Sequence, residues 1–137
     1  MASNRIWGDR NSEKIVILDS SGILMIFEYS IQIKDQLLGL IGKHKIVIPI
    51  TIKKELEKLS IKGKGKTKIN ARAALEYIKQ YDILDFQERM KADDSLLVTA
   101  KKVNGLILTN DSELRRRAKK EGIKTVFLRG RQRLAIS

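Results

Sequence analysis

Short apolar runs alternate with longer amphipathic stretches along most of this 137-residue chain, and no other feature restricts its fold as much. The runs are rich in β-branched residues and almost continuously apolar, as expected of strands buried on both faces. Strands that alternate with helices favour a parallel sheet with helices on both sides. The sequence therefore predicts an α/β fold. The five strand candidates are KIVILD (14–19), KIVIP (45–49), DILDF (82–86), GLILT (105–109) and KTVFL (124–128).

Helical patterns fill the intervals between these strands. The segment IKGKGKTK (61–68) lies between two of them and is predicted to be a mobile basic arm. It ends in Gly-Lys-Thr like a phosphate-binding loop, but Ser60 stands where that motif requires a glycine, so no nucleoside triphosphate site is expected. The expected helices cover about 22–42, with a break near Tyr29, then 51–60, 67–80, 93–103 and 112–121.

Composition narrows the classes of function. The net charge of +12 favours a polyanionic partner, either nucleic acid or an anionic membrane. The chain has no cysteine, which excludes disulfides and thiolate metal sites and favours an intracellular, cytoplasmic protein. No apolar run approaches the roughly 20 residues of a membrane span. Residues 1–13 are expected to form a polar lead-in, pinned by Trp7, and residues 14–137 one domain with a buried core.

Four separate segments place an acidic residue just after a predicted strand or in the first turns of the next helix. Ligands of open α/β sheets bind at this edge. Carboxylates that share a site repel one another unless a cation lies among them, and oxygen ligands without Cys or His suit Mg²⁺ or Mn²⁺. Such an ion can activate water and stabilise charge on a phosphate, so the sequence predicts metal-dependent phosphodiester hydrolysis. The acids are Asp19, Glu55, Asp93 with its neighbour Asp94, and Asp111.

Each acid also has a purely structural explanation. Asp93, Asn110 or Asp111 would serve as a helix N-cap, with Asn110 and Glu113 forming a capping box. Glu55 would pair with a lysine along an exposed helix face. For any single acid, a structural role explains its presence about as well as a role in a metal site does. The coincidence of four segments at one edge of the sheet favours the site.

Basic residues gather in three clusters. They are expected to flank the acidic edge, which is the edge of the sheet that carries Asp19, Glu55, Asp93, Asp94 and Asp111. A solvated helix face is the usual meaning of such a run, but together the clusters suit contacts with phosphates. Aromatic residues make up only 5% of the chain, so a broad base-stacking surface is not expected. The residues expected to contact nucleic acid are Lys62, Lys64, Lys66, Lys68, Arg115, Arg116, Lys119, Arg129 and Arg131.

In their order along the chain, the acidic motifs resemble those of the PIN-domain ribonucleases. The similarity covers roughly residues 14–133 and is strongest to the archaeal branch related to VapC toxins and to the eukaryotic nuclease that trims pre-ribosomal RNA. One departure is that the first motif of the family often continues Asp-Thr-Asn, whereas this chain has Asp19-Ser20-Ser21, in which Ser20 can offer a hydroxyl near the metal. The motifs are ILDSSGILMIFE, IPITIKKELEKL, ADDSLLVTAKK and LTNDSELRRRAKK.

The resemblance implies a three-layer α/β/α fold with a central five-stranded parallel sheet. It also implies Mg²⁺- or Mn²⁺-dependent cleavage of RNA. The four acids that match the catalytic quartet of the family are Asp19, Glu55, Asp93 and Asp111. Asp19, Asp93 and Asp111 would be the metal ligands, with Asp94 as an accessory ligand.

The leading functional hypothesis is therefore a metal-dependent endoribonuclease that acts in RNA processing, including that of ribosomal RNA, or as a toxin. The alternative is a non-catalytic RNA-binding module with the same fold. A phosphoacceptor regulatory domain also uses acids at the edge of a parallel sheet, but it would pair them after the first strand, and here the pair follows the third. The expected partners are RNA, an antitoxin or a ribosome-assembly protein, and a second copy of the chain.

Overall fold

The computed structural model describes residues 13–85 and 89–137, which form one six-stranded sheet in the order β3-β2-β1-β4-β5-β6. The first five strands are parallel, and β6 is antiparallel to β5. The predicted α/β class with a parallel sheet is confirmed. The strands are β1 (Lys14–Leu18), β2 (His44–Pro49), β3 (Asp82–Leu84), β4 (Leu106–Leu108), β5 (Thr125–Arg129) and β6 (Arg133–Ile136).

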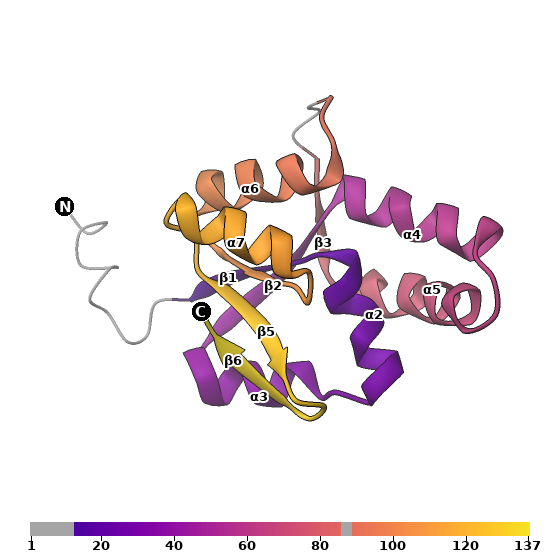
Figure 1. Cartoon of the computed structure of the whole chain (residues 1–137), viewed down its shortest axis with the longest axis horizontal. Helices are drawn as coiled ribbons and strands as arrows, with labels where there is room; N and C mark the ends of the chain where they lie inside the picture. The colour runs from indigo at the N-terminus through magenta and orange to yellow at the C-terminus, as the bar shows by residue number, and fades with distance from the viewer. Residues whose placement is uncertain (1–12, 86–88) are drawn as a thin grey trace.

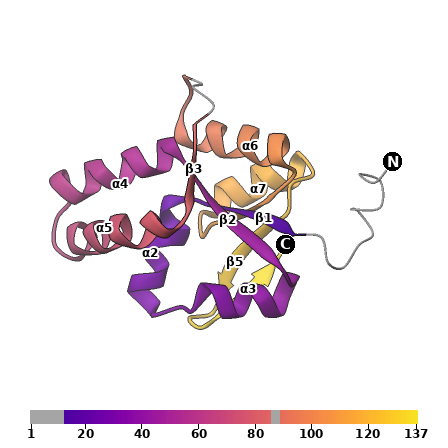
Figure 2. The same ribbon diagram turned by 180° about the vertical axis from the view of Figure 1, so that it is seen from behind.

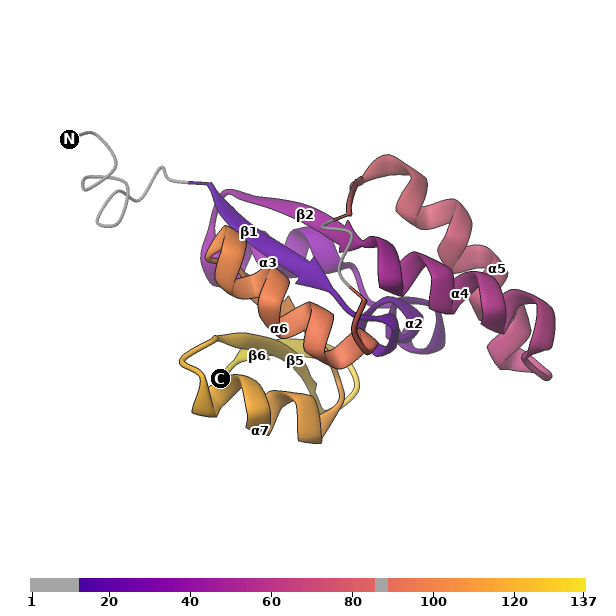
Figure 3. The ribbon, with the colours of Figure 1, turned by 90° about the horizontal axis from the view of Figure 1, so that it is seen from above.

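Helices lie on both sides of this sheet, with α6 and α7 above the strands and α3 below them in the view of Figure 1. Figure 2 shows the same layers from behind. Seen from above, α4 and α5 lie side by side and extend beyond the strands (Figure 3). In the described part of the chain, no helix is long and apolar enough to cross a membrane. The helices are α2 (Ser20–Tyr29), α3 (Ile33–Ile41), α4 (Ile50–Lys62), α5 (Lys66–Tyr77), the 3₁₀ turn η1 (Ile78–Gln80), α6 (Ala92–Val103) and α7 (Ser112–Lys120).

The predicted break near Tyr29 is confirmed, because α2 ends there and Ser30 adopts a left-handed conformation with φ 55°. The predicted basic arm is wrong, since α4 continues to Lys62 and α5 begins at Lys66. Residues 63–65 are a tight connection in which the Gly63 N–H donates to the Leu59 carbonyl at 2.8 Å. The glycines and lysines of this segment therefore join two helices that pack on each other.

The sixth strand was not expected from the sequence. Its first residue, Arg133, follows the basic residues Arg129 and Arg131, and the apolar signal of Leu134, Ala135 and Ile136 is short. Gly130, with φ 70°, turns the chain between β5 and β6. Gln36 of α3 then holds β6 through two hydrogen bonds, accepting from the Leu134 N–H at 2.7 Å and donating to the Gln132 carbonyl at 2.6 Å. An edge strand fixed by such distant contacts leaves little trace in local sequence.

Tyr77 and Tyr81 pack on each other, with ring centroids 5.5 Å apart. Phe27 completes the group, 5.8 Å from Tyr77 in an edge-on arrangement. Trp7, which was expected to pin the lead-in, and Phe86, at the end of the third predicted strand, lie outside the described residues.

The two central strands bring the first and fourth acidic motifs together. In β1 and β4, Leu18 pairs in register with Leu108, and both side chains are fully buried. Because the strands are parallel, the residues that follow them leave the sheet at the same edge. Asp19 and Thr109 are therefore neighbours, and the Asp19 N–H donates to the Leu108 carbonyl at 3.2 Å.

Candidate active site

Asp19 is a buried carboxyl that caps α2, with only 5% of its surface exposed. Its Oδ1 accepts from the Gly22 N–H at 3.0 Å and from Ser21 Oγ at 2.8 Å. Its Oδ2 accepts from the Thr109 hydroxyl. Burial raises the pKa of Asp19, and these hydrogen bonds act in the opposite direction by favouring the charged form. The side chain is thus held in one orientation at the end of β1.

Two hydroxyl groups connect Asp19 to the loop after β4. Thr109 Oγ1 accepts from the Asp111 N–H at 3.0 Å while it donates to Asp19. Ser21 Oγ accepts from the Asn110 N–H at 3.0 Å. Sequence reasoning pointed to Ser20 and missed both of these groups. The available signals were the hydroxyl of Ser21 where the family often has Asn, and a threonine at the end of a strand.

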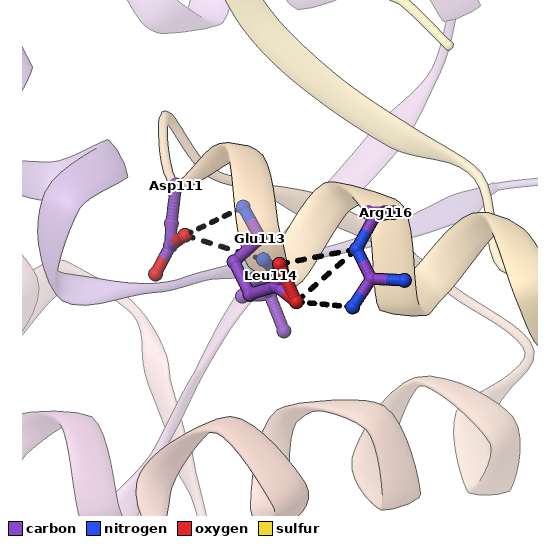
Figure 4. A network of polar contacts seen from close by, with 4 residues as sticks. All are labelled: Asp111, Glu113, Leu114 and Arg116. Atoms are coloured by element: carbon purple, nitrogen blue, oxygen red, sulfur yellow. Dashed lines mark hydrogen bonds and ion pairs between the residues drawn. The ribbon is translucent and has the colours of Figure 1, made fainter.

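Asp111, and not Asn110, caps α7. Asp111 Oδ1 accepts from the backbone N–H groups of Glu113 at 2.9 Å and Leu114 at 3.2 Å (Figure 4). The predicted capping box of Asn110 and Glu113 is wrong, because Glu113 instead pairs with Arg116 (Figure 4). The Asn110 side chain accepts from a backbone N–H of β5, at Leu128, at 3.0 Å. These contacts leave the second carboxylate oxygen of Asp111 outside the cap.

Asp93 lies in the first turn of α6, whose N-cap is Lys91. Partial burial raises the pKa of Asp93, and the negative charge of Asp111 is the next largest cause. Glu55 raises this pKa further, from the first half of α4. Three elements therefore bring carboxylates into electrostatic contact around Asp93. That is the edge of the sheet where the sequence predicted them.

Asp94 takes a different partner. Its Oδ1 accepts from Arg117 Nη2 on α7 at 2.5 Å, and both side chains are partly exposed. The two adjacent acids of ADDSLL thus differ in their surroundings. Asp93 is influenced by the charges of Asp111, Arg117 and Glu55, whereas Asp94 forms an ion pair with Arg117.

The donor chemistry of this edge suits a divalent ion, because it consists of carboxylate oxygens whose mutual repulsion a cation would relieve. In residues 13–85 and 89–137, however, no three Asp, Glu or His side chains converge closely enough to hold one ion. Hydrogen bonds hold Asp19, and an ion pair holds Asp94. The assignment of Asp19, Asp93, Asp94 and Asp111 as metal ligands stays a prediction.

Two of the predicted basic clusters lie at different connections of the fold. Lys62, Lys64 and Lys66 are exposed at the connection between α4 and α5. Arg129 and Arg131 are exposed at the β5–β6 hairpin. The charge of Arg131 acts on Tyr29, which places the hairpin by the C-terminal end of α2. Lys68 is partly buried on α5, and its predicted contact with RNA stays a prediction together with the others.

The cations of α7 are not equivalent. The guanidinium carbon of Arg115 lies 3.5 Å from the centroid of the Phe127 ring, so its side chain packs on the sheet as well as carrying charge. Arg116 is engaged by Glu113 on the same helix. Lys119 is exposed.

Asp19→Asn is expected to stabilise the metal-free protein near pH 7. Burial raises the folded-state pKa of Asp19, so the folded protein binds the proton more tightly than the unfolded chain does. The cost of ionising this carboxyl is therefore present above the folded pKa and disappears below the unfolded pKa. Asparagine keeps the N-cap without a buried charge. In EDTA the variant should gain on the order of 1 kcal/mol near pH 7 and nothing near pH 3.

Thermal unfolding at both pH values measures this difference. Glu57→Gln is the matched control, because it neutralises an exposed acid of α4 and should change stability little at either pH. A lower unfolding temperature for Asp19→Asn than for the wild type near pH 7 would contradict the account of Asp19.

Known proteins resemble this chain over nearly its whole length. A family model described as "PIN like domain" matches residues 16–131. Ribonuclease VapC9 of Archaeoglobus fulgidus is 29% identical over 129 residues, which cover 94% of this chain and 93% of that protein. Ribonuclease VapC4 of Methanocaldococcus jannaschii is 31% identical over 125 residues, covering 88% and 95%.

Solved structures resemble the fold as well. The structure of the PIN domain endonuclease Utp24 superposes with a TM-score of 0.78 at 23% identity, covering 94% of this chain and 95% of that one. A domain of a functionally unknown protein from Methanocaldococcus jannaschii gives a TM-score of 0.60 at 24% identity, covering 85% and 92%. The family model spans all four predicted acids, from Asp19 to Asp111. The chain belongs to the family of PIN-like domains.

Proposed function

We propose that this protein is an endoribonuclease that uses Mg²⁺ or Mn²⁺ to hydrolyse phosphodiester bonds of RNA. The observation that carries the proposal is the surroundings of Asp93 in the first turn of α6, where burial and the charges of Asp111 and Glu55 raise the pKa of its carboxyl. The three carboxylates come from separate elements near the sheet edge where α/β proteins bind ligands. The two relatives named as ribonucleases support RNA as the substrate.

In this proposal, Asp19, Asp93 and Asp111 hold one or two divalent ions, and Glu55 is a further ligand or orients the attacking water. A bound ion would supply an acidified water and neutralise charge on the phosphate. The side chains of the protein itself fix the relative positions of two of these acids. The hydroxyl of Thr109 fixes Asp19 and the Asp111 backbone at the same time, so these two carboxylates keep a constant relation.

In this proposal, the exposed cations bind RNA on either side of the acids. Lys62 lies seven residues beyond Glu55 on the same helix, about 10 Å along its axis. Arg131 lies by the far end of α2, whose N-cap is Asp19, about 15 Å away along that ten-residue helix. An RNA strand that crosses the acidic edge would meet phosphate-binding groups in both directions. Binding should weaken steeply with salt.

The test is cleavage of labelled single-stranded and structured RNA by the full chain in Mn²⁺, in Mg²⁺ and in EDTA. We expect cleavage with either metal and none in EDTA. Asp19→Asn should lose about a hundredfold or more in rate. Because the same variant is expected to be at least as stable as the wild type, unfolding would not explain the loss. Glu57→Gln should cleave like the wild type. Equal cleavage by the wild type and Asp19→Asn would exclude this function.

A non-catalytic RNA-binding module is the second candidate. It is favoured by the side-chain arrangement in the described residues, where no three acidic or histidine side chains converge on one point. Salt-sensitive RNA binding without cleavage in either metal would support it over the nuclease.

The biological setting that we propose is cytoplasmic, with a role in RNA processing or as a toxin-type ribonuclease. The partners would be a ribosome-assembly protein in the first case and an antitoxin in the second, and a second copy of the chain in either. A short open reading frame beside the gene would support the toxin role, and neighbouring ribosomal genes would support processing.

A further inference from the structure

Arg117 is directed at the acidic edge. Its Nη2 donates to Asp94 Oδ1 across the gap between α7 and α6, at 2.5 Å. Its charge also acts on Asp93, where it is the main influence that opposes the neighbouring carboxylates. Its side chain is 36% exposed, so the guanidinium is neither buried nor extended into solvent. Among the cations of α7, Arg117 is the one whose charge lowers the pKa of Asp93.

Two ion pairs fix α7 against α6. Besides the pair of Arg117 and Asp94, Lys101 of α6 pairs with Glu121 at the end of α7 at 2.5 Å. The two helices lie side by side in Figure 1 and Figure 3. With α7 held at two points, the position of the Arg117 guanidinium relative to Asp93 is also set.

We propose that Arg117 is a substrate-positioning residue that binds a non-bridging phosphate oxygen of RNA at the acidic edge, and that Asp94 holds Arg117 in place instead of binding the metal. The proposal deepens the ribonuclease function and rests on it. A guanidinium has five N–H donors, and the contact with Asp94 uses one. Its planar fork matches phosphate, and a side chain that is already ordered loses little freedom on binding.

The acidic edge needs such a group because it repels the substrate. Asp93 and Asp111 carry negative charge at the place where the phosphate must come. Lys62, at the end of α4, is about 10 Å from Glu55 along the helix axis and suits a different phosphate. Arg117 is therefore a cation whose position is suited to the reacting phosphate itself, whereas the exposed clusters suit neighbouring phosphates of the RNA strand.

Four variants test the proposal: Arg117→Gln, Arg117→Lys, Asp94→Asn and, as the control, Lys120→Gln. The control removes the same charge from an exposed position of α7, so it matches the general electrostatic loss. Two measurements do not require turnover: RNA binding in EDTA, and Mn²⁺ binding without RNA by calorimetry. The third is the separation of kcat from KM during cleavage in saturating Mn²⁺.

Loss of a charged hydrogen bond to the phosphate should lower kcat/KM of Arg117→Gln by about tenfold to a hundredfold, with partial recovery in Arg117→Lys. Arg117→Gln should also bind RNA more weakly in EDTA than Lys120→Gln does. It should bind Mn²⁺ at least as tightly as the wild type, because a competing positive charge is gone. Asp94→Asn should keep Mn²⁺ affinity within about twofold.

Two results would overturn the proposal. One is RNA binding by Arg117→Gln that equals that of Lys120→Gln. The other is a loss of about tenfold or more in Mn²⁺ affinity for Asp94→Asn, which would make Asp94 a metal ligand. If the wild type binds RNA but cleaves none, the ribonuclease function fails. The binding comparison in EDTA would still decide whether Arg117 holds a phosphate.

Discussion

Asp93→Asn should reduce the rate of Mn²⁺-dependent RNA cleavage by about a thousandfold at saturating RNA. The reason is the setting of this carboxyl, because burial raises its pKa and the negative charges of Asp111 and Glu55 raise it further. A bound cation gains most where several carboxylates repel one another. The substitution removes the central one of them. The N-cap of α6 is Lys91, so the start of the helix does not depend on the Asp93 side chain.

Single-turnover cleavage and Mn²⁺ binding by calorimetry measure the effect. Asp35→Asn is the matched control, because Asp35 occupies the first turn of α3 and is remote from the acidic edge. We expect it to cleave RNA like the wild type. The variant Asp93→Asn should lose metal affinity as well as rate, and its unfolding temperature in EDTA should not fall, because repulsion is relieved. Cleavage within about tenfold of the wild-type rate would remove Asp93 from the site.

The sequence could locate the central strands because burial on both faces leaves an uninterrupted apolar run. Ile17 of β1 and Ile107 of β4, for example, are completely buried. The acids could be found for the same reason, since each follows such a run or lies in the first turns of the next helix. The edge strand β6 could not, because it alternates exposed and buried positions over only four residues. It pairs with β5 and contacts α3, and the local sequence pattern contains no information about such contacts.

The interactions around the acids could not be predicted either, because they join residues far apart in the chain. Thr109 donates to Asp19 from 90 positions away, and Arg117 reaches Asp94 from another helix. A sequence shows that a hydroxyl or a cation is present but not which carboxylate it will meet. The sequence predicts Asp93 as a metal ligand and Asp94 as an accessory one, but the pairing of Asp94 with Arg117 is visible only in the three-dimensional arrangement.

Gly22→Ala should destabilise the protein by about 3 kcal/mol. Gly22 lies in the first turn of α2, where the helix passes directly over the end of β4. A Cβ at this position would lie 2.4 Å from the Leu108 carbonyl oxygen and 2.7 Å from Leu108 Cδ2. A carbonyl in the sheet cannot turn aside as a flexible side chain does, so α2 must move away. That movement also pulls the Gly22 N–H from Asp19, to which it donates at 3.0 Å.

Gly39→Ala provides the matched control, because the same change in α3 places a Cβ with nothing within 4 Å. It should be neutral or stabilising by up to about 1 kcal/mol, through better helix propensity and a less flexible unfolded chain. Urea denaturation of both variants separates the steric effect from the general effect of replacing a helical glycine. Equal stability of the two variants would mean that α2 can shift without cost. In that case the close approach of α2 to β4 would not be what fixes Asp19 at the acidic edge.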